Sequence, residues 1–221
     1  MLLKTLLKHL RQKIFKGHRE RFLSNIFFHI IVNYHKKKNI RILDFGSGFK
    51  PEIAFYLRKK LNNKKYNSQI HCYDFYTEED LKKLNKHNSL RFFNLKNLNI
   101  KKKYDFILIS DVLHHIGVKN EKKICSILKD LKKYSKNILI KDHFEYGIFS
   151  RILLVLMDFI GNYYNNVNTA FRYFRQKDFH SLLGRANLKI VKKFTNIRYY
   201  NKYFIFFNNP KLHFIYLLKE K

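Results

Sequence analysis

Four ionisable side chains lie in two short segments of the sequence, His114 and His115 in one and Asp142 and His143 in the other. Each segment directly follows an apolar run typical of a buried strand. Histidine accepts a proton near neutral pH, and an aspartate can hold an imidazole in one orientation. A single loop histidine can equally serve packing, but three that follow strands favour chemistry. We therefore predict a general base, with His115 and His143 first, His114 close behind, and Asp142 orienting an imidazole.

A metal site at these segments is the weaker interpretation. Asp111, His114 and His115, with Asp142 and His143 nearby, supply ligand types that a divalent ion accepts. One carboxylate beside two adjacent histidines is not a spacing typical of metal sites. The sequence therefore does not predict a metal.

A second group of residues surrounds a glycine turn at residues 40–50, where an apolar run leads to Asp44, Gly46 and Gly48. Glycines let the backbone turn sharply and approach a ligand closely, and Pro51 suits the first turn of a helix. A dinucleotide site would need a third glycine at position 51. An acid before the turn also suits a cationic ligand better than a pyrophosphate. The pattern predicts a small-molecule cradle after a first strand.

The elements that must position these residues alternate along the first two thirds of the chain. Strands are predicted at 40–45, 70–75, 90–95, 104–110 and 137–140, and helices at 51–60, 78–86 and 121–134. The order predicts an α/β doubly wound sheet with its site at the carboxyl edge of the strands. Asp74 ends the second strand, where an acid can accept hydrogen bonds from both ribose hydroxyls of a nucleoside.

The rest of the chain departs from strict alternation. Helices are expected at 2–16, 22–34, 148–160 and 176–185, and strands at 188–194, 203–207 and 212–218. Helix 2–16 has a leucine face flanked by lysines, which suits either a packing helix or a membrane-surface helix. The insert at 148–174 is unusually apolar and aromatic, which favours a hydrophobic or aromatic ligand.

Three segments resemble the class I S-adenosyl-L-methionine (SAM)-dependent methyltransferases that act on small molecules, similar to those of the ubiquinone and menaquinone pathways. Asp44-x-Gly46-x-Gly48 resembles their motif I, Asp74 stands where they carry the ribose-binding acid, and residues 104–115 resemble motif IV and its following loop. The sequence departs from the family at Lys50, where a third glycine is common. It departs again at Asn94, where an aspartate often meets the adenine.

The resemblance implies a Rossmann-like sheet of seven strands, mostly parallel with an antiparallel last strand. It implies two regions, N-terminal amphipathic helices at 1–37 and a methyltransferase domain at 38–221 with a lid at about 144–175. It also implies SAM as the cofactor. The residues it assigns to cofactor binding are Asp44, Gly46, Ser47, Gly48, Asp74, Phe75, Asn94, Leu95, Ser110 and Asp111. The expected reaction is methyl transfer to a small hydrophobic acceptor, at oxygen first and carbon next.

The net charge and the cysteine content leave two alternative functions open. The net charge of +30 suits nucleic acid or an acidic membrane, but dispersed lysines in an Asn-, Ile- and Tyr-rich chain also fit compositional bias. The rivals are an RNA methyltransferase and an inactive binding subunit of the same fold. Cys72 and Cys125 suggest neither a disulfide framework nor a metal site. We expect a cytoplasmic protein that could contact the inner face of a membrane through residues 1–16.

Overall fold

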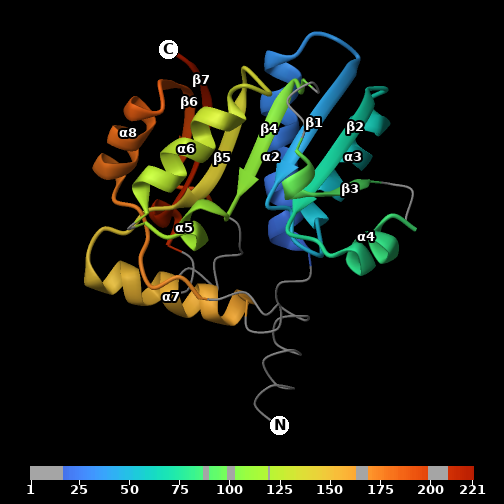
Figure 1. Ribbon diagram of the computed structural model, residues 1–221. Coiled ribbons are helices and arrows are strands. Elements are labelled where there is room, and N and C mark those ends of the chain that lie inside the picture. The colour runs from blue at the N-terminus through green and yellow to red at the C-terminus, as the bar shows by residue number, and fades with distance from the viewer. Residues whose placement is uncertain (1–16, 87–89, 99–102, 119, 163–168, 199–208) are drawn as a thin grey trace.

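The computed structural model describes residues 17–86, 90–98, 103–118, 120–162, 169–198 and 209–221 (Figure 1). The helices are α2 (His18–Tyr34), α3 (Glu52–Asn63), α4 (Glu78–Leu84), α5 (Leu113–Ile116), α6 (Glu121–Leu131), α7 (Ile148–Asn162) and α8 (Gln176–Arg185). The strands are β1 (Asn39–Phe45), β2 (Asn67–Asp74), β3 (Arg91–Asn94), β4 (Phe106–Ser110), β5 (Ile138–His143), β6 (Leu188–Thr195) and β7 (His213–Glu220). The predicted helix 2–16 and strand 203–207 lie outside the described residues.

The seven described strands form one sheet in the order β3-β2-β1-β4-β5-β7-β6. Neighbouring strands from β3 to β5 pair in parallel, and β7 runs antiparallel to both β5 and β6. The predicted fold class is therefore confirmed. The chain order reverses between β1 and β4, and this switch point is where open α/β sheets bind their ligands.

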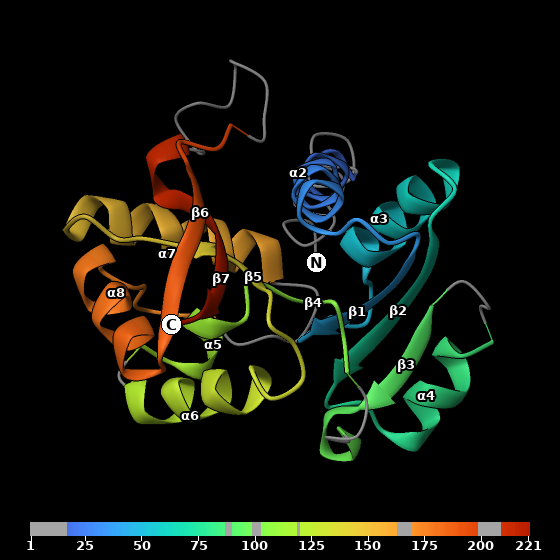
Figure 2. The same ribbon diagram turned by 90° about the horizontal axis from the view of Figure 1, so that it is seen from above.

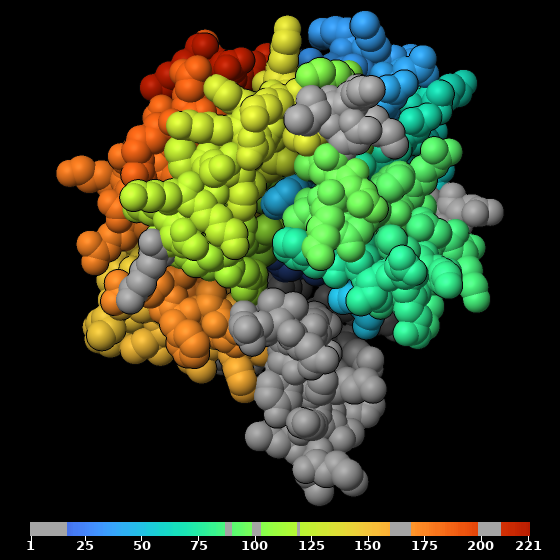
Figure 3. Space-filling model, viewed as in Figure 1, coloured from blue at the N-terminus to red at the C-terminus, as the bar shows by residue number. Residues whose placement is uncertain are grey.

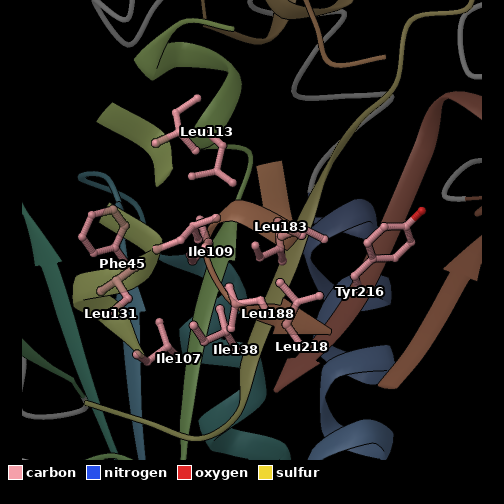
Figure 4. Close-up of a cluster of buried hydrophobic side chains, with 14 of the residues drawn as sticks. Phe45, Ile107, Ile109, Leu113, Leu131, Ile138, Leu183, Leu188, Tyr216 and Leu218 are labelled. Carbon is pink, nitrogen blue, oxygen red and sulfur yellow. The ribbon is translucent and has the colours of Figure 1, made fainter. Parts of the chain in front are cut away.

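Helices cover both faces of the sheet. Seen from above, α2 and α3 lie on one face and α6 and α8 on the other (Figure 2). Strand β4 is apolar at four consecutive residues, and its alternate side chains enter the cores of the two faces. Ile107 and Ile109 pack in the core beneath α6 and α8, shown in Figure 4. Burial on both faces is why this strand is the most continuously apolar of the chain.

Two elements differ from the sequence-based expectation, and both affect the site. Strand β5 continues to His143 instead of ending at Ile140, because Lys141, Asp142 and His143 pair with β7. A short helix, α5, forms where a loop was expected. Asp111, just before α5, has a left-handed backbone with φ of 57°.

Helix α7 lies across the carboxyl edge of the sheet, beyond the ends of β4 and β5 (Figure 1). Two hydrogen bonds tie it to the segment before α8. The Tyr173 hydroxyl donates to the Leu154 carbonyl at 3.0 Å, and Ala170 N–H donates to Asp158 Oδ2 at 2.8 Å. Within the described part of the chain, no helix is both long and apolar enough to cross a bilayer.

Candidate active site

The glycine turn forms a tight cradle after β1. Both Gly46 and Gly48 have positive φ, 73° and 66°. Gly46 N–H donates to the Tyr73 carbonyl at 2.8 Å, which joins the turn to β2. A Cβ at Gly46 would lie 2.5 Å from Val112 Cγ2, whereas a Cβ at Gly48 would have no atom within 4 Å. Gly46 therefore permits close packing, and Gly48 borders open space where a ligand could approach the backbone.

The Asp74 carboxylate organises the edge beside this turn. Its Oδ2 accepts a hydrogen bond from Gly48 N–H and its Oδ1 accepts one from Phe75 N–H, both at 2.7 Å. Each carboxylate oxygen has a further lone pair and could still accept a hydroxyl hydrogen bond. Ser47 Oγ lies 2.8 Å from the Tyr76 hydroxyl, which donates to the Gly48 carbonyl. These bonds hold the turn in one shape.

The Asn94 side chain bridges two segments at the end of β3. Its Nδ2 donates to the Tyr76 carbonyl, and its Oδ1 accepts a hydrogen bond from Lys96 N–H at 2.8 Å. The side-chain carbonyl of Asn94, which was expected to meet the adenine, therefore caps the short turn that contains Leu95. Its Oδ1 keeps one lone pair that a ligand could use. Phe75, next along this edge, is exposed.

Asp44 lies at the end of β1 and is buried. Burial, and then the nearby charge of Asp74, raises the pKa of Asp44 to about 7. A cationic ligand beside this carboxyl would favour its ionised form and offset the cost of burial. Lys50, which stands where the family commonly has glycine, was expected to point to solvent because its charge would repel a cationic cofactor. It is exposed.

An ion-pair network follows β4. Asp111 contacts the Lys141 ammonium and the Arg19 guanidinium, and its Oδ1 lies 2.9 Å from His143 Nε2. Burial alone would raise the pKa of Asp111, but the charges of Lys141 and Arg19 hold this pKa well below its usual range. The Ser110 Oγ beside it is buried without a hydrogen-bond partner among the described residues.

Asp142 brings the two histidine segments together. Its Oδ1 lies 2.6 Å from His114 Nδ1 and accepts a hydrogen bond from His143 N–H at 2.8 Å. The ring centroids of His114 and His115 are 4.1 Å apart, and those of His114 and His143 are 5.5 Å apart. All four residues predicted as the catalytic group therefore lie in one cluster at the carboxyl edge.

The three imidazoles differ in protonation. Burial works against charge on His114, but Asp142 outweighs it and raises the pKa of His114 to about 9. Burial and then the Lys141 charge lower the pKa of His143 to about 4. Burial and then the neighbouring His114 also lower the pKa of His115. At neutral pH His115 and His143 are therefore neutral imidazoles, whereas His114 is an imidazolium.

Four residues complete the cluster that were not predicted for it: Arg19, Lys141, Asp158 and Tyr173. Asp158 Oδ1 lies 3.6 Å from His115 Nε2, and the Tyr173 ring packs 5.1 Å from the His114 ring. Asp158 could have been singled out from the sequence, because it is the acid within the apolar helix predicted at residues 148–160. Arg19 had no such signal, because its contact with Asp111 spans 92 residues of sequence.

The fold and the cradle define a Rossmann-like protein built for a nucleoside-containing, positively charged cofactor. SAM fits this donor set, because Asp74 can accept from ribose hydroxyls, buried Asp44 favours a cation, and Ser110 Oγ has an unused hydrogen-bonding capacity. The sequence profile described as Methyltransferase domain matches residues 7–193. The chain belongs to this family and is a class I SAM-dependent methyltransferase.

Solved structures agree with this assignment at the level of fold. The plantazolicin methyltransferase BpumL in complex with SAH is 19% identical, with a TM-score of 0.63 over 99% of this chain and 90% of that one. The SAH-bound magnesium protoporphyrin IX methyltransferase from Synechocystis is 14% identical, with a TM-score of 0.60 over 96% and 87%. The Burkholderia thailandensis 1,6-didemethyltoxoflavin-N1-methyltransferase is 15% identical, with a TM-score of 0.58 over 93% and 79%. No curated protein sequence matches.

Proposed function

We propose that this enzyme transfers the methyl group of SAM to an oxygen atom of a small hydrophobic or aromatic acceptor, with carbon as the next choice of acceptor atom. The observation that carries the proposal is a largely buried, neutral His143 held by Asp111 at the carboxyl edge of the sheet. An oxygen acceptor must lose a proton, and a positioned imidazole can accept it.

SAM, when bound, supplies a methyl group on a sulfonium, and the neutral thioether S-adenosylhomocysteine (SAH) is the leaving group. The residues of the chain then have to bind SAM and the acceptor, orient the acceptor atom towards the methyl group and exclude water from both. In our proposal Asp74 accepts from the ribose hydroxyls, Asn94 Oδ1 and Leu95 meet the adenine, and Asp44 offsets the positive charge. The backbone at Gly46, Ser47 and Gly48, with the Ser110 and Asp111 segment, lies against the methionine part.

His143 is the preferred base because of how its two ring nitrogens are placed. Nε2 lies 2.9 Å from Asp111 Oδ1 and 3.1 Å from Lys141 Nζ, so the shorter contact favours a proton on Nε2 that is donated to Asp111. Nδ1 then keeps its lone pair, and it has no hydrogen-bond partner among the described residues. His115 is the second candidate. His114 and Asp142 form an ion pair that orients both segments.

The reaction can be tested with SAM labelled in its methyl group and a panel of phenols, catechols and hydroquinones with and without alkyl tails. Label should enter the organic extract. His143→Asn should lower kcat by about 10²-fold to 10⁴-fold, the usual contribution of a general base, while SAM affinity measured by calorimetry stays unchanged. His180→Asn, on the exposed side of α8, is the matched control. Label recovered only in RNA, or full activity of His143→Asn, would contradict the proposal.

We also propose that α7 contacts a bilayer with anionic headgroups, which fits a hydrophobic acceptor. Over residues 148–159, where the side chains of this helix are described, the exposed ones are all apolar: Ile148, Phe149, Ile152, Leu156 and Phe159. This helix has two charged residues, and both have partners. Arg151 donates to Glu145, and Asp158 lies beside His115 and accepts from Ala170 N–H. In the space-filling view the gold surface of α7 reaches the lower left edge of the molecule (Figure 3).

Charge beside this apolar side supports an anionic partner. Arg172, Arg175 and Lys177 are exposed on the segment that α7 packs against. A helix of 15 residues is about 22 Å long, which suits a helix lying in the interface better than one that spans a bilayer.

Vesicle flotation tests the bilayer contact. Phosphatidylcholine vesicles containing phosphatidylglycerol should bind the protein, and Phe149→Asp with Leu156→Asp should weaken binding at least about tenfold. Phe55→Asp, an exposed aromatic on α3, is the matched control. Binding that survives the α7 substitutions but is lost on deletion of residues 1–16 would assign the contact to the N-terminal segment instead. A dimer that dissociates on Phe149→Asp would assign the α7 side to self-association.

A further inference from the structure

Three side chains from α5 and α7 point their donor atoms at one another. Asp158 Oδ1 lies 3.8 Å from His114 Nε2 and 3.6 Å from His115 Nε2, and all three donor atoms lie within 4.8 Å of one another. Ligands at about 2.1 Å around a tetrahedral zinc ion are roughly 3.4 Å apart. These two separations therefore exceed those of an occupied site by only a few tenths of an ångström.

The local helix explains why adjacent histidines can share one ion. Neighbouring residues on a regular helix point in different directions. Helix α5 has only four residues, and the rings of His114 and His115 lie 4.1 Å apart with 40° between their planes. Both Nε2 atoms therefore approach Asp158, which comes from a helix more than 40 residues further along the chain. Sequence spacing alone does not predict this set of ligands.

The surroundings of His114 match those of a metal-binding histidine. Such residues almost always donate the other ring N–H to a carboxylate, which fixes the tautomer. His114 Nδ1 lies 2.6 Å from Asp142 Oδ1, which leaves Nε2 directed towards Asp158. Asp158 Oδ2 accepts from Ala170 N–H at 2.8 Å, and this bond holds the carboxylate in place.

The carboxylates of the cluster differ in how many cationic partners they already have. Asp111, Asp142 and Asp158 lie near one another, and both Lys141 and Arg19 pair with Asp111. Among the described residues two groups could hold a metal ion, and the one formed by His114, His115 and Asp158 is the better, because Asp111 in the other already pairs with two cationic side chains.

We infer that His114 Nε2, His115 Nε2 and Asp158 Oδ1 form a site for a divalent transition-metal ion, with Zn²⁺ the ion that best suits two imidazoles and one carboxylate. Binding of the ion would release the proton that His114 Nε2 carries in the metal-free protein, because a metal-binding imidazole must be neutral. Three protein ligands leave a fourth position open, as in catalytic zinc sites. If the proposed methyl transfer to oxygen holds, that position would bind the acceptor hydroxyl and lower its pKa. This last role rests on the proposed function, whereas metal binding itself does not.

Metal binding can be measured without SAM or acceptor. Untagged full-length protein, stripped with a chelator, is titrated with Zn²⁺ against a chromophoric competitor and with Co²⁺ by absorption. We expect one ion per chain and the visible spectrum of tetrahedral Co²⁺. His115→Ala and Asp158→Asn should each weaken Zn²⁺ binding on the order of a hundredfold. Asp142→Asn should weaken it by roughly 10-fold to 100-fold. His180→Ala, which removes a histidine outside the cluster, should leave the affinity unchanged.

Two outcomes would overturn this inference: wild-type protein that binds no Zn²⁺, or a bound ion whose affinity is unchanged in His115→Ala and Asp158→Asn. Circular dichroism and SAM calorimetry on the same variants check that they fold. A protein that methylates phenols without binding Zn²⁺ would overturn the metal site alone. A protein that binds Zn²⁺ through these residues and methylates no phenol would overturn the proposed reaction alone.

Discussion

Replacing Gly46 with alanine should destabilise the enzyme in two separable ways. A residue with a Cβ at φ of 73° costs about 1–2 kcal/mol in the left-handed region. The new Cβ would also lie 2.5 Å from Val112 Cγ2 and 2.9 Å from Val112 Cγ1. Overpacking of this kind costs about 1–3 kcal/mol. The expected loss in free energy of unfolding is therefore roughly 2–5 kcal/mol.

Gly48→Ala is the matched control, because its φ of 66° is similar and no atom lies within 4 Å of the new Cβ. It should cost only about 1–2 kcal/mol. Val112→Ala removes both clashing Cγ atoms and leaves Val112 Cβ at 3.3 Å. The double variant Gly46→Ala/Val112→Ala should therefore recover the overpacking part, a coupling energy of about 1–3 kcal/mol.

Urea unfolding followed by circular dichroism gives the stability of the wild type and of the four variants, and SAM calorimetry shows whether the turn still binds the cofactor. The reasoning is refuted if Gly46→Ala costs no more than Gly48→Ala. It is equally refuted if the double-mutant cycle gives no coupling, because the clash with Val112 would then not exist in solution.

Three further predictions concern charged groups. The pKa of Asp44 rises from 3.8 to about 7 on folding, so the unfolding free energy of the cofactor-free protein should fall by roughly 4 kcal/mol as pH rises through this window. Roughly 3 kcal/mol of that fall lies between about pH 5 and about pH 8, and Asp44→Asn should remove it in urea titrations at these two pH values. Asp74→Ala should weaken SAM binding at least about tenfold by calorimetry, and equal affinity would refute its ribose role. Glu145 accepts two bonds from Arg151, at 2.9 and 2.7 Å, and Glu145→Gln should cost about 1–3 kcal/mol in thermal unfolding, with coupling to Arg151→Ala.

The sequence by itself determined the order of strands and helices with useful precision. Helix α8 was predicted at residues 176–185 and has these bounds, and β4 was predicted from its continuous apolar run. These signals are local, because each depends on how apolar side chains repeat along one element. The carboxyl-edge rule then placed Asp44, Asp74, His114 and His143 at one edge without any knowledge of side-chain contacts.

Strand β5 shows where the local signal failed. Three polar residues at 141–143 were expected to follow the strand, yet they continue it and are wholly or largely buried. Their burial depends on pairing with β7, some 70 residues further along, and on the charge of Asp111. A local pattern carries no information about a partner at that distance.

The tertiary structure alone decided which histidines are neutral and which side chains lie beside them. Asp142 and burial set the protonation of His114 and His143 in opposite directions, although both histidines follow strands in the same way. Asp158 and Arg19 enter the cluster from α7 and α2, two helices that are far apart in the sequence. Burial and long-range charge determine acid–base chemistry, and both arise only when distant segments pack together.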